Sequence, residues 1–545
     1  MSGRAAFVVV AVLSAALRAQ DPAPKRVGTG VVRGMVTAAA TGQPIRGVDI
    51  RLSGGSITTF EPRWVRTDEK GRFEVRGLDA GRYNLTAQKV GYITLNYGQT
   101  RPGEAGRPVE VSEGTPLDDI NFAMPRGGVI VARMTDAFGD PLRGIVVRPL
   151  VPAFSFTTGE RQLQQAPGSA MNATDDRGEV RLYGLAPGEY YLITDNVFLG
   201  ATRDDAPTFY PGTLQASEAL PVRIGVGEEV PVAFSTIRVR PARLSGVIIG
   251  SNGTPLTTPQ VSFARPTING GSSRRMTVEA DGSFNEENLL AGDYVIQVRE
   301  PEFGTVTVRV FGDDITGLAV NTRKPATVRG RLTFEGAPPP DREVQIRPAF
   351  LGTAPMPGLS AGVLRSRSGV GSIAVGPDDD WTFEATIAGL GVLRFQNPPT
   401  SAASGWFLKT VLLDGKDVTD TPLDFSTNYD GKKVEVVLTR KSSEISGTVA
   451  DARGQIVRDC AVAVFPEDET QWTMVSRHIA AARPDQEGRF ALHGLPPGRY
   501  LIAAVDYLAS SQERNPETLA RLRADATSFT LAEGETRTQN LRLDR

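Results

Sequence analysis

Short runs in which apolar and polar residues alternate, separated by turn signals, make up most of this chain. In residues 71–78, GRFEVRGL, Phe73 and Val75 fall on one face of an extended strand, while Arg72 and Glu74 fall on the other. This period of two is typical of a strand with one buried face. An Asp-x-x-Gly step at residues 68–71 precedes the run. It suits a tight turn, because Asp bonds nearby backbone and Gly adopts positive φ.

The whole pattern recurs along the chain. Its first core position returns at steps of 107, 104, 99 and 107 residues, at Phe73, Val180, Phe284, Phe383 and Phe490. A tyrosine closes most of the copies, at Tyr83, Tyr190, Tyr294 and Tyr500. A period of about 100 residues matches one small domain. The fourth copy, residues 377–395, is degenerate, because Trp381 stands where the turn glycine is expected.

Each copy also opens with two alternating runs around a Gly-containing turn, which is a hairpin signal. Short strands with turns every ~8–12 residues indicate β-sandwiches. We therefore predict an all-β chain, a tandem array of about five Ig-like β-sandwich domains. The predicted domains are residues 27–124, 125–238, 239–323, 324–440 and 441–545, after a signal peptide at residues 1–19.

One short helix is predicted near residues 516–525. Asn515 suits the N-cap and Pro516 the first helical position, and Glu517 suits the positive end of the helix dipole. Leu519 and Leu522 share a face of this helix. A related insertion occupies residues 210–220 of the second copy. We interpret both as packing elements that close an edge of a sandwich, in preference to binding helices.

The repeat motifs resemble those of the carboxypeptidase regulatory-like domain, which is similar to transthyretin (prealbumin). In the first copy the resemblance is carried by Gly34, Val36, Gly42, Pro44, Gly47 and Val48, and by Asp68, Gly71, Phe73, Gly77, Leu78, Gly81 and Tyr83. It covers nearly the whole mature chain, most clearly in copies one, two and five. It implies a seven-stranded transthyretin-like sandwich with Greek-key connections and no catalysis of its own, in bacterial secreted proteins. Such signature residues specify a fold rather than a site.

The N-terminus has the pattern of a secretory signal. Arg4 precedes an apolar run at residues 5–17, and Ala19 offers a cleavage position. The run is too short to span a bilayer, and no later stretch reaches ~18 apolar residues. We expect an exported protein that is periplasmic, outer-envelope-associated or extracellular, with no membrane span after signal cleavage. Cys460 is the only cysteine, so no internal disulfide can form, and its alternating neighbours suit a small core residue better than a nucleophile.

The charges give no sign of a charged polymer as partner. There are 60 basic and 62 acidic residues, and neither sign runs in blocks, so we expect no nucleic acid partner and no binding to anionic lipid. Asn121, Asn321 and Asn540 lie on predicted closing strands. Adhesin-type sandwiches that resemble these units can carry Lys–Asn cross-links, but no lysine lies on a predicted opening strand. We expect the domains to be held by their cores alone.

Candidate catalytic and metal-binding residues are few. His478 and His493 are the two histidines, and no HExxH or Cys-x-x-Cys motif is present. Ser360 in GLSAG matches a nucleophile-elbow pattern, but prolines and a Gly/Ser-rich stretch surround it, whereas that motif needs a strand before it and a helix after it. The acidic turn at residues 377–380 lacks a calcium-loop pattern. We predict no catalytic, cofactor-binding or metal-binding residue and no cofactor.

Three function hypotheses follow. The leading one is a non-enzymatic secreted or envelope protein that serves as a spacer, adhesive or interaction scaffold, with a reach of roughly 100 Å or more if the units are extended. The second is a carbohydrate- or peptide-binding module, which aromatic residues clustered on one face would favour. Of the four tryptophans, Trp64 and Trp472 precede Asp-x-x-Gly turns, where an indole can stack on a sugar ring or a peptide or can equally cap the edge of the sandwich. The third is a cryptic hydrolase. A protein or polysaccharide partner is expected, but its identity stays open.

Overall fold

A computed structural model describes residues 28–54, 62–101, 103–154, 161–167, 172–195, 205–265, 272–339, 344–350, 363–366, 369–370, 373–376, 380–396, 405–425, 429, 431–509 and 512–543. Across these residues the chain consists mainly of β-strands arranged in paired sheets. The predicted all-β class is therefore confirmed. The predicted signal peptide and Ser360 lie outside the described residues. Within them, no helix is long and apolar enough to cross a membrane.

The third sandwich shows the repeating topology most plainly. Its strands are β20 (Ala242–Ile249), β21 (Gln260–Arg265), β22 (Ser272–Arg275), β23 (Ser283–Leu289), β24 (Gly292–Glu300), β25 (Gly304–Val310) and β26 (Ile315–Asn321). One sheet has the order β23-β20-β26 and the other β22-β21-β24-β25. The opening strand β20 pairs antiparallel with β23 and parallel with the closing strand β26. Because the first and last strands run in the same direction, the chain enters one end of the sandwich and leaves at the other.

The first two sandwiches repeat this order with extra short strands. The first contains β1 (Gly30–Ala38), β2 (Asp49–Gly54), β3 (Arg63–Arg66), β4 (Arg72–Leu78), β5 (Gly81–Gln88), β6 (Leu95–Asn96), β7 (Val109–Val111), β8 (Pro116–Leu117) and β9 (Phe122–Met124). The second contains β10 (Gly128–Thr135), β11 (Val146–Phe154), β12 (Arg161–Gln165), β13 (Asn172–Ala173), β14 (Glu179–Leu185), β15 (Gly188–Asp195), β16 (Asp205–Ala206), β17 (Val222–Ile224), β18 (Glu229–Ser235) and β19 (Ile237–Arg238).

The fourth sandwich is the most divergent, because its outer sheet extends to the order β30-β29-β32-β27-β37-β34-β35. Its strands are β27 (Ala326–Glu335), β28 (Val344–Phe350), β29 (Val363–Ser366), β30 (Gly369–Val370), β31 (Ile373–Val375), β32 (Thr382–Ala388), β33 (Leu390–Gln396), β34 (Phe407–Leu413), β35 (Lys416–Asp417), β36 (Leu423–Asp424) and β37 (Lys433–Thr439). The fifth contains β38 (Glu444–Ala450), β39 (Ala461–Pro466), β40 (Ala480–Ala482), β41 (Arg489–His493), β42 (Gly498–Val505), α1 (Pro516–Leu522), β43 (Thr527–Leu531), β44 (Thr536–Thr538) and β45 (Leu541–Arg542).

The closing tyrosines are equivalent and buried, as predicted. None is more than 5 % exposed. Each hydroxyl donates to the carbonyl oxygen four residues earlier, at 2.7–2.9 Å: Tyr83 to Asp79, Tyr190 to Ala186, Tyr294 to Leu290 and Tyr500 to Pro496. Burial raises the pKa of Tyr190 to about 12 despite its hydrogen bond to Ala186. The tyrosine thus fills the core and fixes the turn before its own strand.

A glycine of the opening strand lies opposite a phenylalanine of the strand that pairs with it. Four sandwiches pair them: Gly34 with Phe73, Gly246 with Phe284, Gly330 with Phe383 and Gly447 with Phe490. A Cβ on any of these glycines would overlap a backbone carbonyl oxygen of a neighbouring segment. In the second sandwich the pair is Ala132 with Val180, so a larger residue on one strand accompanies a smaller one on the other.

The Asp-x-x-Gly steps form the predicted turns. Asp68 Oδ1 accepts from the backbone N–H of Lys70 at 2.9 Å and of Arg72 at 2.8 Å, and Gly71 has a φ of +71°. The second and fifth sandwiches repeat this arrangement at Asp175 and Asp485. In the fourth sandwich Trp381 adopts the left-handed φ itself, at +57°, which confirms that the sequence diverges at this turn.

The predicted helix is present as α1, capped by Asn515, whose side chain accepts from the Glu517 N–H at 3.0 Å. Its position differs from the prediction. Leu519, fully buried, packs with Ala463 and Leu501 on the outer face of the sheet formed by β39 and β42, rather than at a sandwich edge. The apolar run AVAVF of β39 is buried on both faces because α1 covers the second one.

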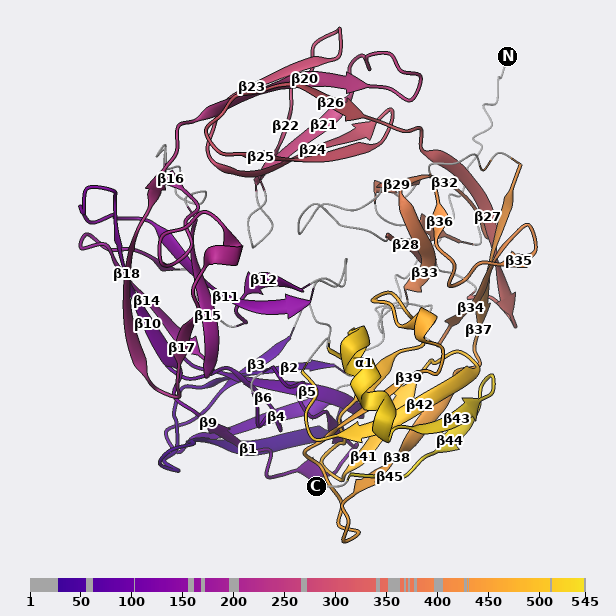
Figure 1. Ribbon diagram of the computed structural model, residues 1–545. Helices are drawn as coiled ribbons and strands as arrows, with labels where there is room; N and C mark the ends of the chain where they lie inside the picture. The colour runs from indigo at the N-terminus through magenta and orange to yellow at the C-terminus, as the bar shows by residue number, and fades with distance from the viewer. Residues whose placement is uncertain are drawn as a thin grey trace, which may run out of the picture.

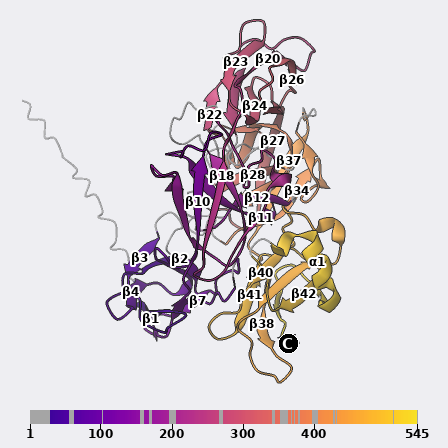
Figure 2. The ribbon, with the colours of Figure 1, turned by 60° about the vertical axis from the view of Figure 1, so that its left-hand side comes forward.

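The sandwiches form a ring rather than an extended row. Figure 1 shows them in chain order around a circle, with the fifth lying beside the first. In the first three, the sheet containing β2, β11 or β21 faces the interior of the circle and the opening strand faces outward. Figure 2, turned by 60°, again places the first and fifth sandwiches next to each other at one end of the molecule.

We propose domain boundaries near Met124, at the end of β9, near Ile237, in the short strand β19, and near Lys324 and Lys441, in the connections between closing and opening strands. Each sandwich has its own cluster of buried hydrophobic side chains between these positions. Limited proteolysis should cut at the boundaries or within residues 151–173 and 352–371. Dominant cleavage inside β4, β14 or β41 would contradict this repeat register.

Candidate functional site

Three of the four tryptophans belong to cores. Trp406 is fully buried and packs edge-on against Phe334, with the ring centroids 5.0 Å apart. Trp381 packs on the other side of Phe334 at 4.6 Å. Trp472 is 7 % exposed, and its indole N–H donates to the Pro466 carbonyl oxygen at 2.8 Å. A ligand-stacking role for Trp472 is therefore wrong.

Trp64 differs from the other three, because 51 % of it is exposed. It lies on the edge strand β3 opposite Arg51 of β2, whose guanidinium is 6.0 Å from the centroid of the indole ring. Figure 1 places β3 toward the interior of the circle. Among the sequence-derived candidates, Trp64 keeps an aromatic surface available for contact.

The remaining candidates have structural positions. Cys460 is fully buried in the core of the fifth sandwich, as expected. His493 lies on β41 with its side chain half exposed, 3.9 Å from Glu444. Asn121 and Asn540 accept, through Oδ1, backbone N–H groups of the opening strands, from Met35 at 2.8 Å and from Thr448 at 3.1 Å. Of the acidic turn at residues 377–380, only Asp380 is described, in a left-handed conformation.

A cluster of charged groups joins the fourth and fifth sandwiches. Asp420 of the fourth accepts from Arg477 of the fifth at 3.0 and 3.2 Å, and from Arg394 at 3.0 Å. Arg477 also donates to the carbonyl oxygens of Leu408 and Lys409, both at 3.1 Å. Burial alone raises the pKa of Asp420, but the His478 hydrogen bond and the two arginines outweigh it, so that pKa lies well below its usual range.

His478 links this cluster to the core of the fifth sandwich. Its Nδ1 lies 2.9 Å from the Tyr500 hydroxyl, and its Nε2 lies 3.2 Å from Asp420 Oδ2. The Tyr500 hydroxyl also donates to the Pro496 carbonyl oxygen at 2.8 Å. His478 therefore connects the buried tyrosine of the fifth sandwich to the carboxylate of Asp420 in the fourth, with one ring nitrogen facing each group.

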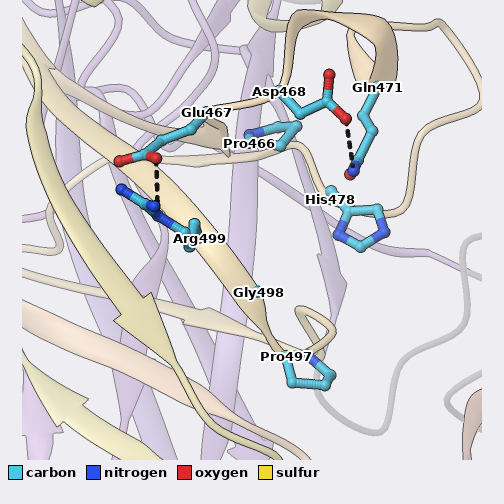
Figure 3. A pocket seen from close by; sticks show the side chains of 8 residues that line it. All are labelled: Pro466, Glu467, Asp468, Gln471, His478, Pro497, Gly498 and Arg499. Carbon is cyan, nitrogen blue, oxygen red and sulfur yellow. Dashed lines mark hydrogen bonds and ion pairs between the residues drawn. The ribbon is translucent and has the colours of Figure 1, made fainter.

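Two cavities border this junction. One has a volume of ≈ 440 Å³ and extends from Phe407, Lys409 and Lys441 to Arg477 and Pro496. The other, of ≈ 380 Å³, is drawn in Figure 3, where His478 lies near Gln471 and opposite the Glu467–Arg499 ion pair. His478 and Pro497 line both cavities. The second cavity is acidic at its rim, because Asp468 lies there beside Gln471.

The arrangement serves to hold two sandwiches together. A histidine between a tyrosine and an aspartate would suit proton transfer, but Arg477 and Arg394 neutralise Asp420, and the Tyr500 hydroxyl is committed to Pro496. Within the described residues, no group of three or more His, Cys, Asp or Glu side chains is placed to hold a metal ion. What the geometry supports is a rigid polar joint.

Sequence reasoning did not identify this joint. His478 was recognised as structural, but Asp420, Arg394 and Arg477 belong to no repeat motif. Their partners across the junction lie 57 to 81 positions away along the chain, so spacing gave no signal. A usable hint was the segment TQWTMVSRHIAA, which lacks the regular alternation of the strands before and after it.

A family model matches the first of the five sandwiches. Residues 31–125 match the carboxypeptidase regulatory-like domain. The resemblance expected from the motifs is confirmed for this part of the chain. The second, third and fifth sandwiches share the sheet order and the tyrosine hydrogen bond of the first, so the sandwich is a repeated unit.

The chain is similar to several solved structures. A streptococcal ancillary pilin is 14 % identical over 54 % of this chain and 98 % of its own, with a TM-score of 0.23. The major pilin subunit of Bacillus cereus is 14 % identical over 54 % and 99 %, with a TM-score of 0.14. Two B repeat units of the collagen-binding protein of Staphylococcus aureus are 10 % identical over 71 % and 94 %, with a TM-score of 0.13. Among curated proteins, none matches the sequence.

Proposed function

We propose that this chain is an exported, non-enzymatic scaffold that holds interaction surfaces in a fixed geometry for a protein or polysaccharide partner. The supporting observation is how the repeat residues are used. The tyrosines, the glycine–phenylalanine pairs and the Asp-x-x-Gly turns all stabilise sandwiches, and the additional polar clusters join neighbouring sandwiches. Such an architecture positions surfaces relative to one another, as rigid domain arrays do.

The test is a pull-down with the purified mature chain on an envelope fraction, with soluble polysaccharides and proteins as competitors. We expect saturable retention of one class of macromolecule. A fluorogenic panel of peptides and esters, with elemental analysis for zinc, is run on the same sample. Turnover that Ser360→Ala abolishes, or one equivalent of zinc, would replace the scaffold by a hydrolase.

A second candidate function is polymer binding through Trp64, favoured by its exposure on the sheet that faces the interior of the circle. An exposed indole offers an apolar face to a sugar ring or a peptide. If this holds, Trp64→Ala should abolish the retention, while Phe138→Ala, which removes an 81 % exposed aromatic from the second sandwich, should leave it unchanged. Equal retention by both variants would exclude Trp64 as the contact.

A further inference from the structure

The loop between β6 and β7 of the first sandwich forms a receptor for one side chain of the fifth. Arg483, 4 % exposed, donates to the carbonyl oxygens of Gly98 at 3.0 Å and Ala105 at 2.8 Å. Its guanidinium lies 3.4 Å from the carboxylate of Glu104, which is itself 4 % exposed. Glu104 also accepts from the backbone N–H groups of Thr100 at 2.9 Å and Arg101 at 3.2 Å, so it shapes the loop that receives the arginine.

Further contacts surround this buried pair. Arg107 donates to Asp459 at 2.5 Å. Gln486 makes a reciprocal pair of hydrogen bonds with the backbone of Glu110, at 3.2 and 3.3 Å. A short antiparallel bridge joins Glu104 and Ala509. A charge buried between domains is costly unless it is paired and hydrogen-bonded. Here Arg483 donates through Nε and Nη1 to carbonyl oxygens of both sandwiches, while its Nη2 makes no hydrogen bond within the described residues and lies 3.7 Å from the carboxylate of Asp459.

The repeat itself shows that this contact is specialised. Arg483 stands two residues before the Asp-x-x-Gly turn, where the first sandwich has Arg66. Arg66 is held by Asp49 of its own sandwich at 2.7 Å. The strand register places Ala461 at the position equivalent to Asp49. The fifth sandwich therefore lacks a carboxylate at that strand position, and the Arg483 guanidinium lies instead between Glu104 of the first sandwich, at 3.4 Å, and Asp459 of its own sandwich, at 3.7 Å.

We infer that the contact between the first and fifth sandwiches is a latch that keeps the chain closed as a ring in solution. The partner of this surface of the first sandwich is thus the fifth sandwich of the same chain. Closure within one chain is favoured over pairing between copies, because a tether holds the two surfaces at high effective concentration. This inference does not depend on the proposed function.

Cysteine cross-linking of the full chain tests the latch. A Cβ placed on Gly103 would lie 3.7 Å from the Ala509 Cβ, close to the separation found in disulfides. The only native cysteine, Cys460, is fully buried and does not compete. We expect Gly103→Cys with Ala509→Cys to form an intramolecular disulfide under mild oxidation, visible as a mobility shift on a non-reducing gel.

Gly42→Cys with Ala509→Cys is the matched control, because Gly42 has a similar positive φ and no atom within 4 Å of its Cβ position. The latch pair should cross-link at least about tenfold faster than this control pair. Equal rates would overturn the latch, and a product of doubled mass in place of the intramolecular one would show that the contact forms between copies.

Removing the charge complementarity gives a second readout. Arg483→Glu faces Glu104 with a like charge and should open the ring, raising the radius of gyration in small-angle scattering by at least about 1.2-fold, because released domains fill a larger volume. Arg66→Glu is the control at the equivalent position and should leave the radius unchanged. An unchanged radius in Arg483→Glu, with the far-UV spectrum of the wild type, would also overturn the inference.

Discussion

The first and fifth sandwiches have similar cores, but the surfaces through which they contact each other differ. Both have a buried tyrosine bonded to a carbonyl four residues earlier and a glycine facing a phenylalanine. On the inward sheet they diverge, because β2 of the first is polar outside, while β39 of the fifth is apolar and covered by α1. The repeated motif therefore sets the fold, and the residues outside it determine what each sandwich contacts.

The largest effect should come from the shared interior. Tyr83→Ala and Tyr500→Ala should each cost roughly 3–5 kcal/mol, the range for truncating a large aromatic in a core. Because the chain has several domains, the measurement is native-state hydrogen exchange, which reports the opening free energy of each sandwich separately. A cost below ~1 kcal/mol in either variant would show that the tyrosine is superficial.

The stability costs at the two tyrosines should differ when only the hydroxyl is removed. Tyr83→Phe loses one hydrogen bond, worth about 1 kcal/mol. Tyr500→Phe loses the bond to Pro496 and also leaves His478 Nδ1 without its partner, so it should cost more. Equal costs would indicate that the His478 contact contributes nothing to the stability of the fifth sandwich.

A smaller loss is expected for Gly447→Ala, at about 1–3 kcal/mol, which is typical of overpacking a core. The new Cβ would overlap the backbone oxygen of Gln539. Adding Phe490→Val, to imitate the Ala132–Val180 pair of the second sandwich, should not restore stability, since the obstacle is backbone. Hydrogen exchange in β38 and β41 checks both variants. If Phe490→Val restored stability, the clash would be with the phenyl ring of Phe490 and not with the backbone.

How far the sequence predicts the structure depends on sequence distance. Alternation, turn glycines and the closing tyrosine act within a few residues or recur at a fixed period, so the fold class, the equivalence of Tyr83 and Tyr500 and the helix cap at Asn515 were predictable. The face covered by α1 was not, because AVAVF fits a strand buried on either one or both faces.

The junctions between sandwiches were not predictable, because the residue pairs that form each one do not recur with the repeat. Asp420 meets His478 across 58 positions, and Glu104 meets Arg483 across two different sandwiches. No period repeats these pairs, and a single sequence shows no covariation. The one local signal was comparative: Ala461 replaces the carboxylate of Asp49 while the arginine is kept at Arg483. It becomes interpretable only once the strand register is known.

The joint between the fourth and fifth sandwiches should weaken in acid. Because the pKa of Asp420 is lowered in the folded chain, its stabilising contribution is complete above the ordinary aspartate range and is lost as the pH falls below about 4. Arg394, Arg477 and His478 face this carboxylate. Thermal melting of wild type and Asp420→Asn should differ at pH 7 and converge toward pH ~2. A constant difference would assign the effect to packing.

The smallest effect should come from Arg66→Ala, and it completes the comparison. Arg66 and Asp49 form an ion pair whose side chains are 70 % and 41 % exposed, and exposed pairs contribute little because water and salt screen them. Arg483, at the equivalent position, is 2 % exposed as a side chain. We therefore expect Arg66→Ala to leave both the melting temperature and the Gly103–Ala509 cross-linking rate unchanged, whereas Arg483→Ala slows the cross-linking. If both variants cross-link at the same rate, Arg483 contributes no more to the contact than Arg66 does. The proposed specialisation of the fifth sandwich is then disproved.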